Sequence, residues 1–97
     1  MITAMLDLRI KPESLAISAA LISRVLTQTR AFAGNAGVDV LVDTDDETHV
    51  VVVELWDSLE SDVAYREWRA TEEGQSDLGT ILADAPTLTK FSTTVAL

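Results

Sequence analysis

The stretch of residues 49–56, HVVVVELW, limits what this chain can fold into more than any other. Successive side chains of a strand point to opposite faces of a sheet, and here valine occupies positions on both faces. A face left in water does not tolerate valine at every second position, so both faces of this strand must be covered. The stretch therefore predicts a central strand with a packed layer on each side.

Three other stretches show the period of two that is typical of strands. They are residues 2–10, 38–43 and 87–97. In the last stretch, one face is expected to carry Phe91, Thr93, Val95 and Leu97.

Helical spacing of apolar residues runs from Pro12 to about Ala31, and Gly34 ends this helix, with Asn35 in the turn that follows. Asp57 or Ser58 is placed to cap a second helix. The apolar face of the second helix is expected to consist of Leu59, Val63, Ala64 and Trp68. A short third helix is expected over residues 78–85, before Pro86.

The order strand, helix, strand, strand, helix, strand predicts an α+β, ferredoxin-like βαββαβ fold. Right-handed crossovers give a four-stranded antiparallel sheet in the order 4-1-3-2, with the helices on one face. The whole chain, residues 1–97, is expected to form one domain. No element is left over to cover the other face of the sheet, so we expect a second copy of the chain to cover it.

Composition also favours a homodimer. A domain of 97 residues buries only roughly 60–65% of its unfolded surface, which makes it marginal alone. The apolar fraction is 47%, which is high for so small a chain. An interface between subunits is the place where such surplus apolar surface is normally buried.

Charge and residue usage exclude several classes of function. The formal net charge of −9, with seven basic residues scattered among sixteen acids, disfavours nucleic acid and anionic membranes as partners. The absence of cysteine excludes disulfides and thiolate chemistry. The acidic turn at residues 43–47 lacks the spacing of a calcium loop, so no metal site is expected. With no run of ~18 apolar residues and no signal peptide, we expect a cytoplasmic protein.

Three short motifs, in this order, resemble one known family. Residues 11–13 (KPE) open the first helix, residues 29–34 (TRAFAG) resemble a helix end, and residues 53–58 (VELWDS) resemble a strand end. Together they resemble the antibiotic-biosynthesis-monooxygenase (ABM) family of dimeric α/β-barrel proteins, over nearly the whole chain.

The resemblance implies a homodimer in which two sheets pack into a barrel-like core, with a pocket between the sheet and the helices of each subunit. Some members of the family oxidise aromatic polyketides to quinones with molecular oxygen and no cofactor. Others degrade haem or isomerise small metabolites. The resemblance therefore implies a small aromatic or apolar ligand and no cofactor.

The chain departs from the family's pattern at its functional positions. Quinone-forming members use an asparagine with the tryptophan, but Val52 stands four residues before Trp56 here. Many relatives carry a histidine nine residues after the tryptophan, where this chain has Tyr65. Haem-degrading members need a histidine on the second helical segment, and the sole histidine is His49, expected at the surface. These departures disfavour haem and weaken the case for polyketide oxidation.

Three aromatic residues are candidates for one pocket wall. The resemblance places a site at Trp56, whose indole N–H would orient a substrate oxygen. Tyr65 would donate a hydrogen bond or act as an acid or base. Trp68 lies three residues further along the same helix face. The alternative is that these aromatic residues only fill the core.

Glu54 and Arg30 complete the set as candidate substrate-binding residues. Glu54 is the one charge on the inner run of the central strand, and a structural ion pair with Arg9 is the alternative. Arg30 ends the first helix, where a cation also suits the helix dipole.

The leading hypothesis is a cofactor-independent, monooxygenase-like enzyme that acts on an aromatic or quinonoid small molecule, with Trp56 and Tyr65 as catalytic residues. The alternative is a non-catalytic small-molecule-binding or dimerisation module on the same fold. An isomerase or a haem-degrading relative fits the residues less well.

Overall fold

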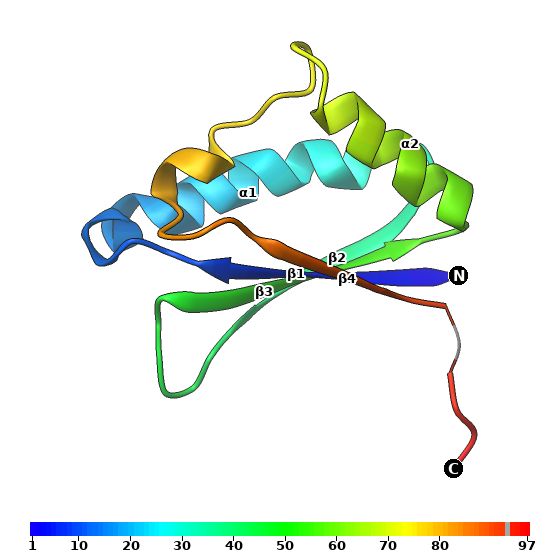
Figure 1. Ribbon diagram of the computed structural model, residues 1–97, viewed down its shortest axis with the longest axis horizontal. Helices are drawn as coiled ribbons and strands as arrows, with labels where there is room; N and C mark the ends of the chain where they lie inside the picture. The colour runs from blue at the N-terminus through cyan, green and yellow to red at the C-terminus, as the bar shows by residue number, and fades with distance from the viewer. Residues whose placement is uncertain (93) are drawn as a thin grey trace.

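The predicted order of elements is confirmed by the computed structural model, which describes residues 1–92 and 94–97 (Figure 1). The elements are β1 (Ile2–Arg9), η1 (Pro12–Ser14), α1 (Leu15–Ala31), β2 (Asn35–Val42), β3 (His49–Trp56), α2 (Leu59–Arg69), η2 (Leu78–Ile81) and β4 (Thr87–Phe91). The strands form one antiparallel sheet in the order β2-β3-β1-β4, which is the predicted order written from the other edge. Both helices lie on one face of this sheet (Figure 1).

β3 is a central strand, as its sequence predicts, with β1 on one side and β2 on the other. Its register places Val52 opposite Leu6 and Glu54 opposite Ala4 on β1. Every second residue of β3, from Val50 to Trp56, is buried beneath the helices. The alternation thus assigns one face of the strand to the core.

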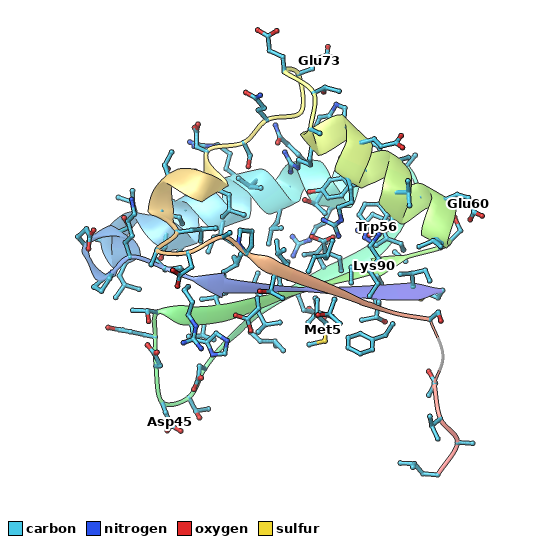
Figure 2. All side chains as sticks on the ribbon, in the orientation of Figure 1. Met5, Asp45, Trp56, Glu60, Glu73 and Lys90 are labelled. Atoms are coloured by element: carbon cyan, nitrogen blue, oxygen red, sulfur yellow. The ribbon has the colours of Figure 1, made fainter. Side chains whose placement is uncertain are left out.

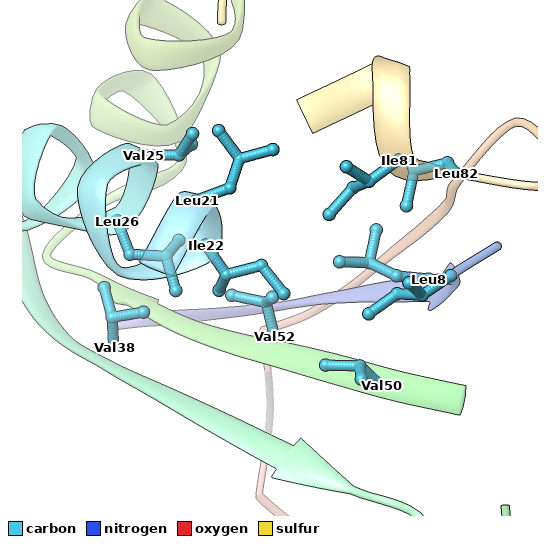
Figure 3. Packing of buried hydrophobic residues seen from close by; sticks show 11 residues of the cluster. Leu8, Leu21, Ile22, Val25, Leu26, Val38, Val50, Val52, Ile81 and Leu82 are labelled. Carbon is cyan, nitrogen blue, oxygen red and sulfur yellow. The ribbon is translucent and has the colours of Figure 1, made fainter. Parts of the chain in front are cut away.

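The core forms where α1 and η2 pack on β1 and β3 (Figure 3). Its largest cluster takes Leu8, Val50 and Val52 from the sheet, Leu21, Ile22, Val25 and Leu26 from α1, and Ile81 and Leu82 from η2 and the residue after it. A second cluster lies at the other end of the sheet and contains Ile2, Ala4, Trp56 and Tyr65, with Phe32 and Trp68 packed against it. Burial of each large aliphatic side chain stabilises the fold by up to about 1.5–3 kcal/mol.

Four boundary predictions are corrected by the structure. The first turn of the first helix is 3₁₀, and the predicted third helix is reduced to the single 3₁₀ turn η2. The last strand ends at Phe91, not at residue 97, while Thr93 lies outside the described residues. Asn35 is the first residue of β2 and pairs with Trp56, so it does not lie in the turn.

The turn between α1 and β2 is tight because Gly34 adopts a φ of 90°, where a side chain is strained. A Cβ at this position would lie 2.3 Å from Ser61 Oγ on α2. The glycine therefore lets the turn pack directly against the start of α2, and this contact brings Asn35 beside Trp56.

No helix of the described residues lies over the second face of the sheet (Figure 1). It carries Met5 from β1, Val51, Val53 and Leu55 from β3, Leu41 from β2 and Phe91 from β4. Leu41 is 52% exposed and Phe91 is 50% exposed. Figure 2 shows Met5 on this side, away from the helices. We call this set of six residues the open face.

His49 bridges two carboxylates beside the open face. Its Nε2 lies 2.9 Å from Asp7 Oδ2, and its Nδ1 lies 2.8 Å from Asp43 Oδ2. Both carboxylates accept a hydrogen bond only when both ring nitrogens carry a proton. These bonds, first that of Asp7 and then that of Asp43, raise the pKa of His49 above its usual value of 6.5, although burial and Arg9 oppose the shift. The expected surface histidine is thus half-buried and paired.

Because the pKa of His49 is raised in the folded state, the folded chain binds this proton more tightly than the unfolded chain. The stabilisation is complete below the ordinary pKa of 6.5 and is lost as the pH rises through the raised pKa. We expect the melting temperature to fall across that window. His49→Gln should flatten this dependence, and thermal melts of both proteins from pH 5.5 to 9 check it. Parallel curves for the two proteins would contradict the assignment.

Candidate functional site

A cavity of about 200 Å³ lies between the sheet and the two helices. Most of its wall is aliphatic: Leu6, Leu8, Ile22, Val25, Leu26, Val52 and Leu78. Its remaining wall is polar and consists of Glu54, Tyr65, Arg66, Arg69 and Ser76. An apolar cavity in which a few polar groups converge is the usual form of a small-molecule site.

The polar wall forms because α2 turns its polar face toward the sheet. Ser58, one of the two predicted caps, is the N-cap of the helix, and its Oγ accepts a hydrogen bond from Ser61 N at 3.2 Å. The buried residues of α2 are Asp62 and Tyr65. Together with Arg66 and Arg69 they recur every three or four residues, so they share one helix face.

The predicted apolar face of α2 is therefore wrong. Leu59 is 49% exposed and Val63 is 40% exposed. Trp68 does lie on the inner side, packed against the cluster that contains Trp56 and Tyr65. The helix turns its polar residues inward, and one of them, Arg66, binds a buried carboxylate on the sheet beneath.

That carboxylate is Glu54, which is 1% exposed. Its Oε1 accepts hydrogen bonds from Trp56 Nε1 at 3.2 Å and from Arg66 Nη2 at 2.6 Å. The same Arg66 Nη2 donates to Asp62 Oδ1 at 3.1 Å, and the Lys90 ammonium contacts Asp62 Oδ2. Figure 2 shows Trp56 and Lys90 between the sheet and α2. Two carboxylates and two cations thus form one balanced network.

The predicted pair between Glu54 and Arg9 does not form. In the register of β1 and β3, Arg9 lies opposite His49, five residues from Ala4, the partner of Glu54. Residues an odd number apart on a strand point to opposite faces, so Arg9 points away from the cavity. It pairs with Asp46 at 3.4 Å instead.

Tyr65 is the polar centre of the cavity wall. Its hydroxyl lies 2.6 Å from Thr29 Oγ1 on α1 and accepts a hydrogen bond from Arg69 Nε at 2.8 Å. Thr29 is fully buried, and Tyr65 is 3% exposed. These bonds fix the ring between α1 and the sheet.

Three aromatic rings pack against Tyr65 behind this wall. The ring centroid of Tyr65 lies 4.9 Å from that of Trp56, 5.3 Å from that of Phe32 and 6.2 Å from that of Trp68. Trp56 is fully buried, and neither tryptophan is among the residues that line the cavity. The rings of Trp56 and Trp68 contact Tyr65 behind the cavity wall. Phe32, which also contacts Tyr65, was not predicted from the sequence.

Arg30 lies away from the other candidates. Its Nη2 donates to Val38 O at 3.2 Å, and its side chain lines a second groove of about 330 Å³. This groove lies between α1 and the edge strand β2, with Val40, Val42 and Glu47 in its wall. The structure thus places Glu54 and Tyr65 in one cavity, Trp56 and Trp68 behind it, and Arg30 elsewhere.

Arg66 and Arg69 were not predicted from the sequence as site residues. Both are four-residue helix neighbours of polar residues that the structure buries, Asp62 and Tyr65. The spacing was visible, but only the buried position of Glu54 turns that face inward. Among the described residues, no group of three or more histidine or acidic side chains is placed to hold a metal ion. In the same residues, no helix has the length and apolarity to cross a membrane.

The family model of antibiotic biosynthesis monooxygenase matches residues 1–76, which include every polar residue of the cavity wall. The chain belongs to this family. The resemblance inferred from the three sequence motifs is therefore confirmed. No curated protein matches the chain.

Solved structures of antibiotic biosynthesis monooxygenases share the fold of this family member. One of them superposes with a TM-score of 0.80 at 22% identity, covering 98% of this chain and 100% of its own. A Nitrosomonas europaea protein assigned to the same family has a TM-score of 0.80 at 17% identity, covering 96% and 98%. A Deinococcus radiodurans protein, also assigned to it, has a TM-score of 0.80 at 20% identity, covering 100% and 96%. At these identities the similarity establishes the ferredoxin-like fold.

Proposed function

We propose that this ABM-family chain is a monooxygenase-like enzyme that oxidises an aromatic or quinonoid small molecule in the cavity beside α2. The observation that carries the proposal is the cavity itself, which is aliphatic along most of its wall and polar only where Tyr65, Glu54 and the two arginines converge. The aliphatic part suits an aromatic ring, and the polar end suits its oxygen substituents.

In the proposed reaction the substrate supplies the electrons, as an anion stabilised by its own ring. One atom of molecular oxygen becomes a new carbonyl oxygen on a ring CH₂ carbon, and the other leaves as water with the two hydrogens. The protein holds the ring in place and excludes water. Tyr65 is the residue we expect to hydrogen-bond the substrate oxygen, while Trp56 acts through Glu54 as a positioning residue.

A non-catalytic binding module is the second candidate, and one observation favours it. The polar groups of the cavity already bind one another: Tyr65 bonds Thr29 and Arg69, and Glu54 bonds Trp56 and Arg66. Such groups can hold a ligand without performing chemistry on it. Oxygen consumption separates this candidate from the enzyme.

The function is tested by oxygen uptake and 1,4-naphthoquinone formation with 1-naphthol as the substrate, whose keto tautomer carries the ring CH₂ that the proposed reaction oxidises; both are measured against the rate without protein. Ser76 is exposed at the edge of the cavity, so Ser76→Trp should block it without disturbing the core. We expect this variant to lose at least about tenfold in uptake, since a misplaced substrate forfeits the benefit of orientation.

The matched control is Ser23→Trp, at an exposed serine that lines the second groove. It should leave uptake unchanged. Loss of uptake in Ser23→Trp but not in Ser76→Trp would move the site to the groove beside Arg30. Binding without any protein-dependent uptake would favour the binding module.

We also infer that two copies pack through their open faces to form a homodimer. The six apolar side chains of the open face support this, because such surface is normally buried against a partner. Sedimentation at micromolar concentration should give about twice 10.5 kDa.

A charge on the open face should break the dimer. Leu41→Glu places a carboxylate at its 52% exposed position, and Leu59→Glu makes the same change at a 49% exposed position on α2, on the other side of the sheet. We expect a monomer for Leu41→Glu and a dimer for Leu59→Glu. A wild-type monomer, or dimers of both variants, would contradict the inferred interface.

A further inference from the structure

Among the described residues, Arg69 is the one cation of the cavity wall whose hydrogen bonds all go to neutral groups. Its Nε donates to Tyr65 Oη at 2.8 Å, and its Nη1 donates to Gln28 Oε1 at 2.9 Å and to Gly74 O at 3.2 Å. Its Nη2 donates to Val25 O at 3.0 Å and to Thr29 Oγ1 at 3.3 Å. These five bonds use all five N–H groups of the guanidinium. The side chain is thus held rigidly, but no partner carries a negative charge.

No carboxylate of the described residues lies within 4.0 Å of Arg69. The guanidinium carbon instead lies 5.2 Å from the ring centroid of Tyr65 and 4.9 Å from that of Trp68. Aromatic faces attract a cation, yet they do not neutralise it. In a chain of net charge −9, this uncompensated cation on a cavity wall calls for an explanation.

Arg66, the other arginine of the wall, offers a contrast. Its charge is matched by Glu54 and Asp62, and Lys90 provides the second cation for these two carboxylates. This network carries no net charge, so the surplus positive charge at the cavity belongs to Arg69. Arg66 Nε is also buried and lacks a hydrogen-bond partner among the described residues. The polar end of the cavity thus holds one N–H group without an acceptor.

A surplus cation beside aliphatic walls favours a negatively charged ligand. Water screens charges poorly in such surroundings, so an anion near Arg69 gains more than it would at the protein surface. The charge of Arg69 also acts through Tyr65, because the Tyr65 oxygen accepts a hydrogen bond from Arg69. The hydroxyl proton of Tyr65 is then left for Thr29 or for a ligand oxygen. The positive charge of Arg69 and the hydroxyl of Tyr65 therefore both attract the same ligand atom, a negatively charged oxygen.

The volume limits the size of this ligand. A dry apolar cavity of about 150 Å³ holds one benzene molecule. The cavity here, at about 200 Å³, has room for one substituted ring or two fused rings. Larger ring systems would extend out of it.

We propose that the cavity binds a one-ring or two-ring phenol as its anion, the phenolate, with Arg69 as the charge that selects this form. On binding, the phenol O–H bond breaks, the electron pair stays on oxygen, and the proton passes to bulk water. The proposal rests on the proposed function, because the phenolate is the electron-rich form that reacts with molecular oxygen. It adds the substrate class and the residue that selects it.

The test uses 4-nitrophenol, whose phenol and phenolate forms absorb at different wavelengths. Titration of the probe from pH 5 to 9, with and without excess wild-type protein, gives the pKa of the bound probe. We expect this pKa to be lowered by about one unit, which is about a tenfold preference for the phenolate. Arg69→Met should abolish the shift, and Arg69→Lys should keep part of it.

Arg24→Met is the matched control, because Arg24 is exposed on α1 and pairs with Asp77 at 3.7 Å, outside the cavity wall. It should keep the full shift. If Arg69→Met does not fold, Arg69→Gln replaces it, since Gln keeps hydrogen bonding but not charge. No binding of 4-nitrophenol to the wild type, an unshifted pKa, or an equal shift in the neutral variants would overturn the proposal.

The assay needs no oxygen, so it fails or succeeds independently of catalysis. A phenolate preference that depends on Arg69, without oxygen uptake, would leave the proposal standing and reject the enzyme. Oxygen uptake without such a preference would reject the proposal and leave the enzyme standing.

Discussion

The structure depends on one buried ion pair, between Glu54 on the central strand and Arg66 on α2. A carboxylate on the core face of a sheet is costly unless a cation and hydrogen bonds meet it there. α2 therefore turns its polar face to the sheet and exposes Leu59 and Val63. Long polar side chains fill the space beneath α2 incompletely, and this leaves a cavity against the aliphatic residues of β1, β3 and α1. The candidate site is thus a consequence of placing one charge in the core.

Much of the fold was accessible from the sequence, because strand and helix periods are local properties. The valines on both faces of β3 identified a central strand, and the handedness of crossovers then gave the strand order. The face of α2 was mispredicted because its apolar residues were counted, while the partner that decides the orientation, Glu54, is remote in sequence. The pairing of Glu54 with Arg9 was wrong for a simpler reason, since the two residues lie on opposite faces of the sheet. Arg69 could not be identified from the sequence, because its proposed role depends on the lack of a carboxylate beside its guanidinium among the described residues, which only the structure shows.

The two faces of the sheet carry different parts of the molecule. The helix-covered face holds the core and the cavity, while the open face carries Met5, Leu41 and Phe91, which we propose a second copy covers. The family match and the shared fold agree with a small-molecule enzyme, but the chemistry depends on the residues of this cavity. Here the wall carries Tyr65 and Arg69, the two residues that we propose bind an acidic oxygen.

The most direct measurement is a crystal structure of the protein with 2-naphthol, a two-ring phenol. The account predicts one molecule in the cavity, with its rings against Leu6, Ile22 and Val52 and its oxygen toward Tyr65 and Arg69. A molecule bound instead in the groove beside Arg30, or a cavity filled by side chains of the protein itself, would contradict it.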